Sequence, residues 1–180
     1  MIVALHLFIV AVVAGLVHIL SLLALPGFVK EDVFSRLGEK AEAGLHILEA
    51  SEARRLPFAD PAMAMAVCRY DLTAGPFRVR TGLSETFLVV VFAEDGRGIF
   101  SSVSDRAATS GALDVVLATE AQLARINALD DRSEAIEEVR ITGSRARGVV
   151  IIKVLVDRPS SRERAMDVLR NARCESEALP

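Results

Sequence analysis

The stretch Thr86–Ala93, which reads TFLVVVFA, decides the fold class of this chain. It is apolar on both faces of an extended strand, as expected for a strand inside a sheet that is covered on each side. The turn Glu94–Arg97 (EDGR) follows, and its Asp-Gly pair is typical of a tight hairpin. Ile99–Val103 then predicts the returning strand. The sequence therefore predicts an antiparallel hairpin within a β-rich domain.

Further strand patterns flank this hairpin. Val67–Leu72 alternates between apolar and charged residues, and Phe77–Thr81 alternates again after the turn Thr73–Pro76, which predicts a half-buried pair. Other strand patterns lie at residues 45–48, 113–117, 136–142 and 149–156. The connections are too short for parallel crossovers. We therefore predict a mainly β fold, an antiparallel β-sandwich or jelly-roll-like domain.

Two capping boxes predict short helices within this domain. Thr119 with Gln122 precedes a helix that runs to about residue 129, and Ser160 with Glu163 precedes a helix at 162–173. The second helix has an apolar face, so we expect this C-terminal helix to pack on one sheet, with Cys174 closing it.

The N-terminal segment Ile2–Val29 contains no Asp, Glu, Lys or Arg. About twenty apolar residues in a helix span a bilayer, so this segment predicts one transmembrane helix. A signal peptide is the alternative, but the nearest cleavage stretch, Ala24–Pro26, contains a proline and no basic residue precedes the apolar run. The predicted organisation is therefore a transmembrane anchor at 1–29, a helix and linker at 30–59, and a β-sandwich domain at 60–180.

Ala11, Gly15 and His18 lie on one stripe of the predicted anchor. Small residues four positions apart let two helices approach closely, which indicates self-association or a partner helix, with chance as the alternative. The orientation of the anchor stays open. Basic residues follow the anchor at 30, 36 and 40, which favours a cytoplasmic C-terminal side, yet long domains translocate largely regardless of such charges.

Composition narrows the function classes. The net charge is -3 with acids and bases interspersed, which argues against a nucleic-acid partner. His46 is the one histidine outside the anchor segment, and neither it nor the two cysteines fit a serine triad or a zinc site, so we predict no cofactor. Carboxylates near strand ends or turns could form an acidic pair for hydrolysis, although such residues are usually turn formers: Asp71, Asp95, Asp105 and Asp114.

A candidate exposed polar patch lies on the first predicted strand pair. Arg69 and Asp71 come from one strand and Arg78 and Arg80 from the next, all on the side opposite the apolar positions. This patch suits an acidic partner or a lipid headgroup. The alternative is an ordinary solvated face balanced by Asp71.

A family resemblance rests on three stretches of the chain. They are Asp60-Pro61-Ala62, then Ala66-Val67-Cys68-Arg69-Tyr70-Asp71-Leu72, and Gly75-Pro76-Phe77-Arg78-Val79. In these the chain resembles the bacterial domain-of-unknown-function family 1254, in its short, membrane-anchored alphaproteobacterial branch. The hairpin over Phe87–Phe100, with Ser104-Asp105-Arg106 after it, and a C-terminal cysteine are similar too. The resemblance implies export and a companion protein that corresponds to the second domain of longer relatives. The family has no established reaction, so it implies no catalytic residues.

Export would allow Cys68 and Cys174 to form a disulfide. Closing a loop of more than a hundred residues stabilises by about 4–5 kcal/mol in the loop-entropy model. The alternative is two free thiols, with Cys68 simply buried. The favoured hypothesis is a non-catalytic binding or assembly module of the cell envelope, anchored in the inner membrane and exposed to the periplasm. The rivals are a membrane-tethered hydrolase using sheet carboxylates and a cytoplasmic-facing accessory subunit of a membrane complex.

Overall fold

We analysed a computed structural model that describes residues 2–28, 37, 41, 44–54, 56, 59–108, 111–129 and 138–178. The chain divides into two compact units, Met1–Glu31 and Asp32–Pro180. The first unit contains helix α1 (Ile2–Phe28), in which Ile2–Leu25 is long and apolar enough to cross a membrane.

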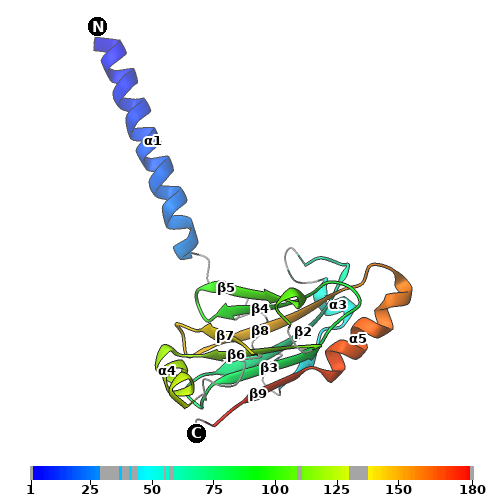
Figure 1. Cartoon of the computed structure of the whole chain (residues 1–180). Helices are drawn as coiled ribbons and strands as arrows, with labels where there is room; N and C mark the ends of the chain where they lie inside the picture. Colours follow the sequence, from blue (N-terminus) through cyan, green and yellow to red (C-terminus); the bar gives the residue numbers. More distant parts are fainter. Residues whose placement is uncertain are drawn as a thin grey trace. The chain divides into compact units, whose positions relative to one another are not determined.

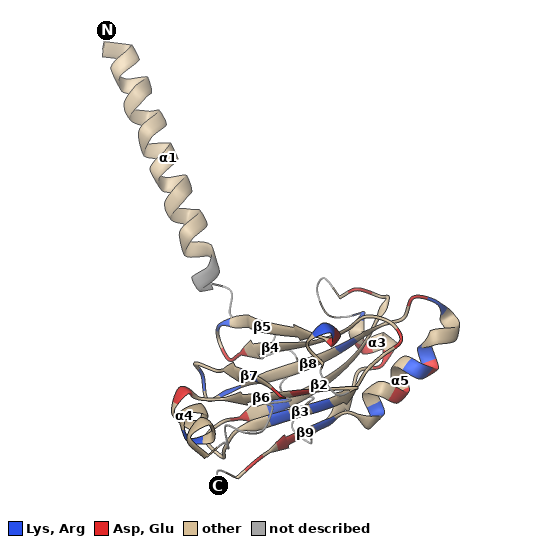
Figure 2. Cartoon of the chain, viewed as in Figure 1, with Lys and Arg blue, Asp and Glu red and all other residues tan. Residues whose placement is uncertain are grey.

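Two polar side chains of α1 bond within the helix. The hydroxyl of Ser21 donates to the Val17 carbonyl at 2.8 Å, and Nδ1 of His6 lies 2.8 Å from the Ile2 carbonyl oxygen. Local bonds of this kind are the ones that satisfy a hydroxyl or imidazole group of a helix in an apolar environment. Figure 2 shows that α1 carries no charged residue.

The second unit is a two-sheet sandwich (Figure 1), so the predicted mainly β fold with short helices and a C-terminal helix is confirmed. Sheet A has five strands, in the order β1 (His46–Ile47), β2 (Met63–Asp71), β8 (Arg147–Leu155), β4 (Leu88–Glu94) and β5 (Gly98–Ser104). Sheet B has four, in the order β7 (Val139–Thr142), β6 (Ala112–Ala118), β3 (Phe77–Gly82) and β9 (Arg173–Ser176). Neighbouring strands are antiparallel except β6 and β7, which are parallel.

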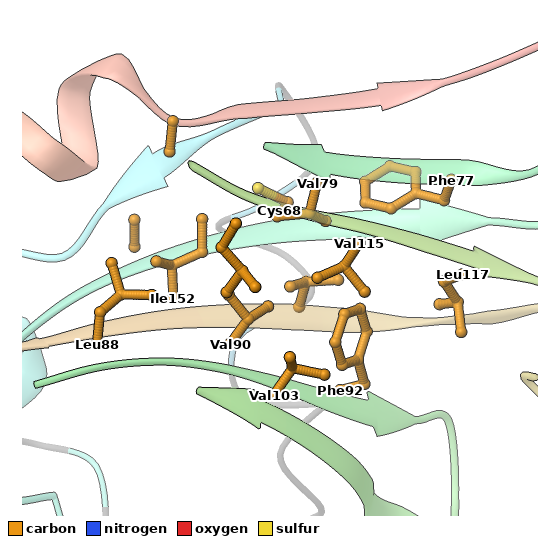
Figure 3. Close-up of a cluster of buried hydrophobic side chains, with 14 of the residues drawn as sticks. Cys68, Phe77, Val79, Leu88, Val90, Phe92, Val103, Val115, Leu117 and Ile152 are labelled. Carbon is orange, nitrogen blue, oxygen red and sulfur yellow. The ribbon is translucent and has the colours of Figure 1, made fainter. Parts of the chain in front are cut away.

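The main core lies between the two sheets because alternate residues of each strand point inward. Figure 3 shows Val90 and Phe92 of β4 facing Val79 and Val115 of sheet B. In β3, Phe77, Val79 and Thr81 are buried while the two arginines between them face outward, as the alternation predicted.

A second apolar cluster covers the outer face of sheet A. Val67, Val91 and Ile151 lie on three adjacent strands, and Leu37 and Leu48 pack against them. This cluster explains why β4 and β8 are apolar on both faces, since each of these interior strands is buried on both sides. The predicted interior position is therefore confirmed for Leu88–Ala93, while Thr86 and Phe87 precede the strand and Phe87 is exposed. The helix expected just after the anchor falls mainly on residues outside the described part of the chain, and the 30–59 linker stays a prediction.

The short helices are α3 (Ala50–Ala53), η1 (Asp105–Ala107), α4 (Glu120–Leu129), η2 (Pro159–Ser161) and α5 (Arg162–Asn171). The Thr119–Gln122 capping box is confirmed: the backbone N–H of Gln122 donates to Oγ1 of Thr119 at 3.3 Å, and Oε1 of Gln122 accepts from the backbone N–H of Thr119 at 2.8 Å. The box predicted at Ser160 and Glu163 is wrong. The turn η2 brings Ser161 to the N-cap of α5 instead, and its hydroxyl bonds to Asp157.

Two other predictions need correction. Strands β2 and β3 do not pair, because the turn at 73–76 carries the chain from sheet A to sheet B. Cys174 does not close the C-terminal helix. It lies in β9, a short edge strand that pairs with β3 after the helix has ended. Helix α5 packs on the main core through Ala165, Leu169 and the following Ala172, as its apolar pattern indicated.

Candidate functional site

A groove of about 300 Å³ lies at one end of the sandwich, and we call it the end groove. The loop between β3 and β4 forms one wall, and the segment from the end of β8 into α5 forms the other. The lining residues are Leu83, Ser84, Glu85, Thr86, Asp157, Arg158, Ser161, Arg164, Ala165, Asp167 and Val168. The size is at the lower limit for a small-ligand site.

The polar groups of the end groove are held by local bonds. The Thr86 hydroxyl donates to the Leu155 carbonyl at 2.6 Å, which ties one wall to the end of β8. The Ser161 hydroxyl donates to Asp157 Oδ1 at 2.7 Å, and this bond, together with Arg158, lowers the pKa of the Asp157 carboxyl. Glu85 pairs with Arg164 at 3.3 Å across the groove. The groove therefore presents carboxylates, guanidinium groups and the apolar side chains of Leu83, Ala165 and Val168 to a ligand.

The opposite end of the sandwich holds a buried carboxylate. Glu94, at the end of β4, is 1 % exposed and accepts the backbone N–H groups of Ser144 and Arg145 at 2.6 and 3.0 Å. It also accepts the Ser144 hydroxyl at 2.8 Å. Burial raises the pKa of the Glu94 carboxyl, but these three hydrogen bonds and nearby Arg97 bring it below its ordinary value.

Tight packing surrounds this carboxylate. Gly148 lies between Tyr70 and the backbone of Ala93, where a β-carbon would come within 2.3 Å of the Tyr70 hydroxyl oxygen. Burial, and then the charge of Glu94, raise the pKa of Tyr70. Ser144 has no activating base here, because an ionised Glu94 with a lowered pKa is a weak proton acceptor. Glu94 therefore anchors the loop between β7 and β8.

An ion-pair network covers the outer face of sheet B, and we call it the Arg78 network. Nη1 of Arg78 lies 3.0 Å from Asp114 Oδ2 and 2.6 Å from Glu138 Oε2, and its Nε lies 2.5 Å from Glu177 Oε1. Burial lowers the pKa of Arg78, but Glu177 and the other carboxylates outweigh it and raise the pKa. Arg80 also pairs with Asp114, at 2.7 Å. Figure 2 shows charged segments on β3 and β9 of this sheet.

The predicted polar patch is divided between the two sheets. Arg69 and Asp71 lie on the outer side of β2 in sheet A, whereas Arg78 and Arg80 lie on the outer side of β3 in sheet B. The patch fails because the turn at 73–76 crosses between sheets, so the outward sides of the two strands point in opposite directions. Asp71 accepts the Thr73 hydroxyl at 2.6 Å, which makes it a turn residue.

The predicted carboxylates do not come together as one site. Asp71 ends β2, Asp95 lies in the turn after β4, Asp105 begins η1, and Asp114 lies in sheet B. Sequence reasoning missed Glu138 and Glu177, the two other carboxylates that pair with Arg78 beside Asp114. Their signal is weak because they are 24 and 63 residues from Asp114 in the chain.

The two cysteines form a disulfide between the sheets. Cys68 lies in β2 of sheet A and is fully buried, while Cys174 lies in β9 of sheet B, and their Cα atoms are 6.4 Å apart. The predicted disulfide is thus present, although it fastens an edge strand rather than the C-terminal helix. Ala11, Gly15 and His18 lie on α1, where all three residues are exposed.

Known proteins resemble the chain only in fold. No family model and no curated sequence matches it. A crystal structure of the VPA0106 protein from Vibrio parahaemolyticus is similar at 9 % identity and a TM-score of 0.51, over 67 % of this chain and 29 % of that one. An uncharacterised protein from Burkholderia cenocepacia shares 14 % identity over 75 % of this chain and 35 % of its own, with a TM-score of 0.49.

The chain therefore spans about a third of the length of these two solved proteins. At such low identity the likeness to VPA0106 shows the sandwich fold alone. Among the described residues there is no group of three His, Cys, Asp or Glu side chains placed to hold a metal ion.

Proposed function

We propose that this protein is a single-pass inner-membrane protein whose sandwich domain lies in the periplasm and serves as a non-catalytic binding or assembly module. The observation that carries the proposal is the Cys68–Cys174 disulfide in a chain that also has a membrane-length apolar helix. Disulfides persist in oxidising compartments such as the periplasm and are rare in the cytoplasm. In this proposal the anchor holds the protein in the inner membrane. The disulfide favours a position of the sandwich domain on the periplasmic side of that membrane.

Binding rather than catalysis is supported by the chemistry of the end groove. A carboxylate pair that hydrolyses substrates needs one acid whose pKa is raised so that it can donate a proton. In the groove, the pKa of Asp157 is lowered and Glu85 is paired with Arg164. Ionised, paired groups of this kind suit recognition of a small polar ligand or of a partner's loop.

The partner in this proposal is a companion envelope protein. The support is the resemblance to the family 1254 branch, which implies such a companion. Self-association through Ala11, Gly15 and His18 of the anchor is the second way in which this module could assemble. Nucleic acid has no place in the proposal, because the net charge is slightly negative.

The test is a topology measurement on the full chain, with alkaline phosphatase fused after Pro180. The enzyme folds only outside the cytoplasm, so the proposal predicts an active fusion. A β-galactosidase fusion at the same position is the matched control and is expected to be inactive. A stably produced but inactive phosphatase fusion with active β-galactosidase would reverse the orientation. It would favour the cytoplasmic accessory subunit.

The hydrolase rival has its own test. The purified full-length protein is assayed against chromogenic esters and glycosides beside the Asp157→Asn variant. We expect no turnover by either protein. Turnover by the natural protein that Asp157→Asn abolishes would contradict the non-catalytic proposal and identify the end groove as an active site.

A further inference from the structure

Strand β5 is a free edge of sheet A. It pairs with β4 on one side, and no described residue bonds to the backbone on its other side. Ile99 is 58 % exposed and Ser102 is exposed as well, so the strand is open to a partner. A row of unpaired N–H and C=O groups on such an edge is a template for another strand.

The other three sheet edges carry the protection that proteins normally give to edges. Strand β1 has only two residues, β7 contains Arg140, and β9 contains Arg173 and Glu175. Short length and charge both prevent pairing with other chains. Strand β5 has seven residues, GIFSSVS, without charge or proline. Its first part does carry one edge protection, an irregularity of register opposite Phe92 and Ala93, whereas residues 101–104 pair regularly with β4 and form an uninterrupted edge.

We propose that β5 pairs antiparallel with β5 of a second copy of this chain, which joins two five-stranded sheets into one. An uncharged strand meets no like charge when it faces itself. Both signs of charge flank the strand, with Asp95 and Arg97 before it and Asp105 and Arg106 after it, so antiparallel pairing of two copies brings no block of like charge together. Two copies therefore meet without repulsion, and the membrane-length helix of each chain makes a second copy the occupant that is held nearest to the strand.

Membrane attachment strengthens the pairing. Helix α1 is apolar enough to confine copies to one membrane, and confinement raises the effective concentration of their domains. The contact is isologous, with the same strand contributed by both chains, so it closes at two copies. The module of the proposed function is therefore a dimer through its domain, independent of any contact between the anchors.

A crosslinking experiment on the full chain in native membranes tests this dimer. Both natural cysteines are bonded, so Ser102→Cys adds the single reactive thiol, in the middle of β5 on its exposed side. A short bismaleimide is expected to give a species of twice the mass. Thr142→Cys, exposed at the end of edge strand β7, is the matched control and is expected to give little crosslinking.

A second pair of variants shows whether strand pairing is the cause. Ile99→Lys, added to Ser102→Cys, places a charge in the edge and is expected to lower crosslinking at least about tenfold. Ile99→Thr at the same position keeps a β-branched, uncharged side chain and is expected to preserve crosslinking.

Three results would overturn the proposal. One is crosslinking of Ser102→Cys no greater than that of Thr142→Cys, and another is equal crosslinking in the Ile99→Lys and Ile99→Thr backgrounds. The third is a crosslinked product whose mass identifies a different protein.

Discussion

The outer faces of the two sheets are covered in different ways, although both sheets share one core. On sheet A, Val67, Val91 and Ile151 are buried under apolar residues from the segment that precedes β2. On the outer face of sheet B, Arg78 of β3 and Asp114 of β6 form an ion pair, so this face carries charged side chains. The outer face of sheet A is therefore buried under apolar side chains, whereas the outer face of sheet B carries a half-exposed ion-pair network.

The difference shows two means of covering a sheet without a large helix. A fully buried aliphatic side chain contributes about 1.5–3 kcal/mol through the hydrophobic effect, whereas an exposed ion pair contributes about 0–1 kcal/mol. The charged face nevertheless hides apolar surface. Val116 is 1 % exposed, and its cross-strand neighbours are Arg78 and Arg140, whose aliphatic stems suit that role. Stability is therefore concentrated on sheet A and in the core.

Removing the disulfide is expected to have the largest effect, because it links β2 of sheet A to the edge of sheet B. The double variant Cys68→Ala, Cys174→Ala opens a connection across 106 residues. We expect its free energy of unfolding to fall by about 4–5 kcal/mol, measured by urea denaturation of the full chain in detergent. Reductant should produce the same loss in the natural protein and none in the double variant. Equal stability of the two proteins without reductant would contradict this link.

The next effect belongs to the apolar outer face. Ile151→Ala removes a side chain that is 4 % exposed and is expected to cost about 2–5 kcal/mol of unfolding free energy. Ile152→Ala on the same strand, which faces the main core, is the matched variant, and we expect a similar loss. A loss below about 1 kcal/mol for Ile151→Ala alone would mean that the outer cluster does not cover sheet A.

A smaller effect is expected on the charged outer face. Arg78→Met leaves Asp114, Glu138 and Glu177 without their shared cation, which we expect to cost about 1.5–3 kcal/mol. Arg80→Met is the control. Its side chain is 60 % exposed, and we expect a change below about 1 kcal/mol that shrinks further in high salt. Equal losses in the two variants would show that Arg78 is not the centre of the network.

The last prediction concerns the pH dependence of stability that Glu94, the buried acid of sheet A, contributes. Its folded-state pKa is lowered below its ordinary value of 4.5, so its contribution is fully present above that value. The contribution is then lost as the pH falls through the lower, folded-state pKa. Denaturation midpoints measured between pH 7 and 3 should therefore fall less steeply for Glu94→Gln than for the natural protein. Parallel pH profiles would contradict this assignment.

Local patterns predicted the fold well. The apolar run at 86–93, the Asp-Gly turn after it and the Thr119–Gln122 box each depend on neighbouring residues, and each has the predicted structure. The errors concern features that depend on which sheet a strand belongs to. The alternation of β2 and β3 predicts which side of each strand is buried, but nothing local shows that the two strands belong to different sheets. The polar patch was wrong for that reason.

The candidate sites were harder to predict than the fold. The Arg78 network joins residues from β3, β6, the start of β7 and the C-terminal segment, and each of them looks like an ordinary surface charge in the sequence. The end groove is likewise formed by two segments about 70 residues apart, the loop between β3 and β4 and the segment from the end of β8 into α5. Pairing of the two cysteines was easier to predict, because no other partner exists for either one.

The oxidation state of Cys68 and Cys174 in living cells tests the central claim most directly. Cells producing the full chain are quenched with acid, denatured, and treated with a maleimide polymer that adds mass for each free thiol. The periplasmic account predicts no addition without reductant and two additions after reduction, while a Cys174→Ser variant should take up one polymer in either case. Two additions to the natural protein without reductant would contradict the account, because both cysteines would then be free thiols in the cell.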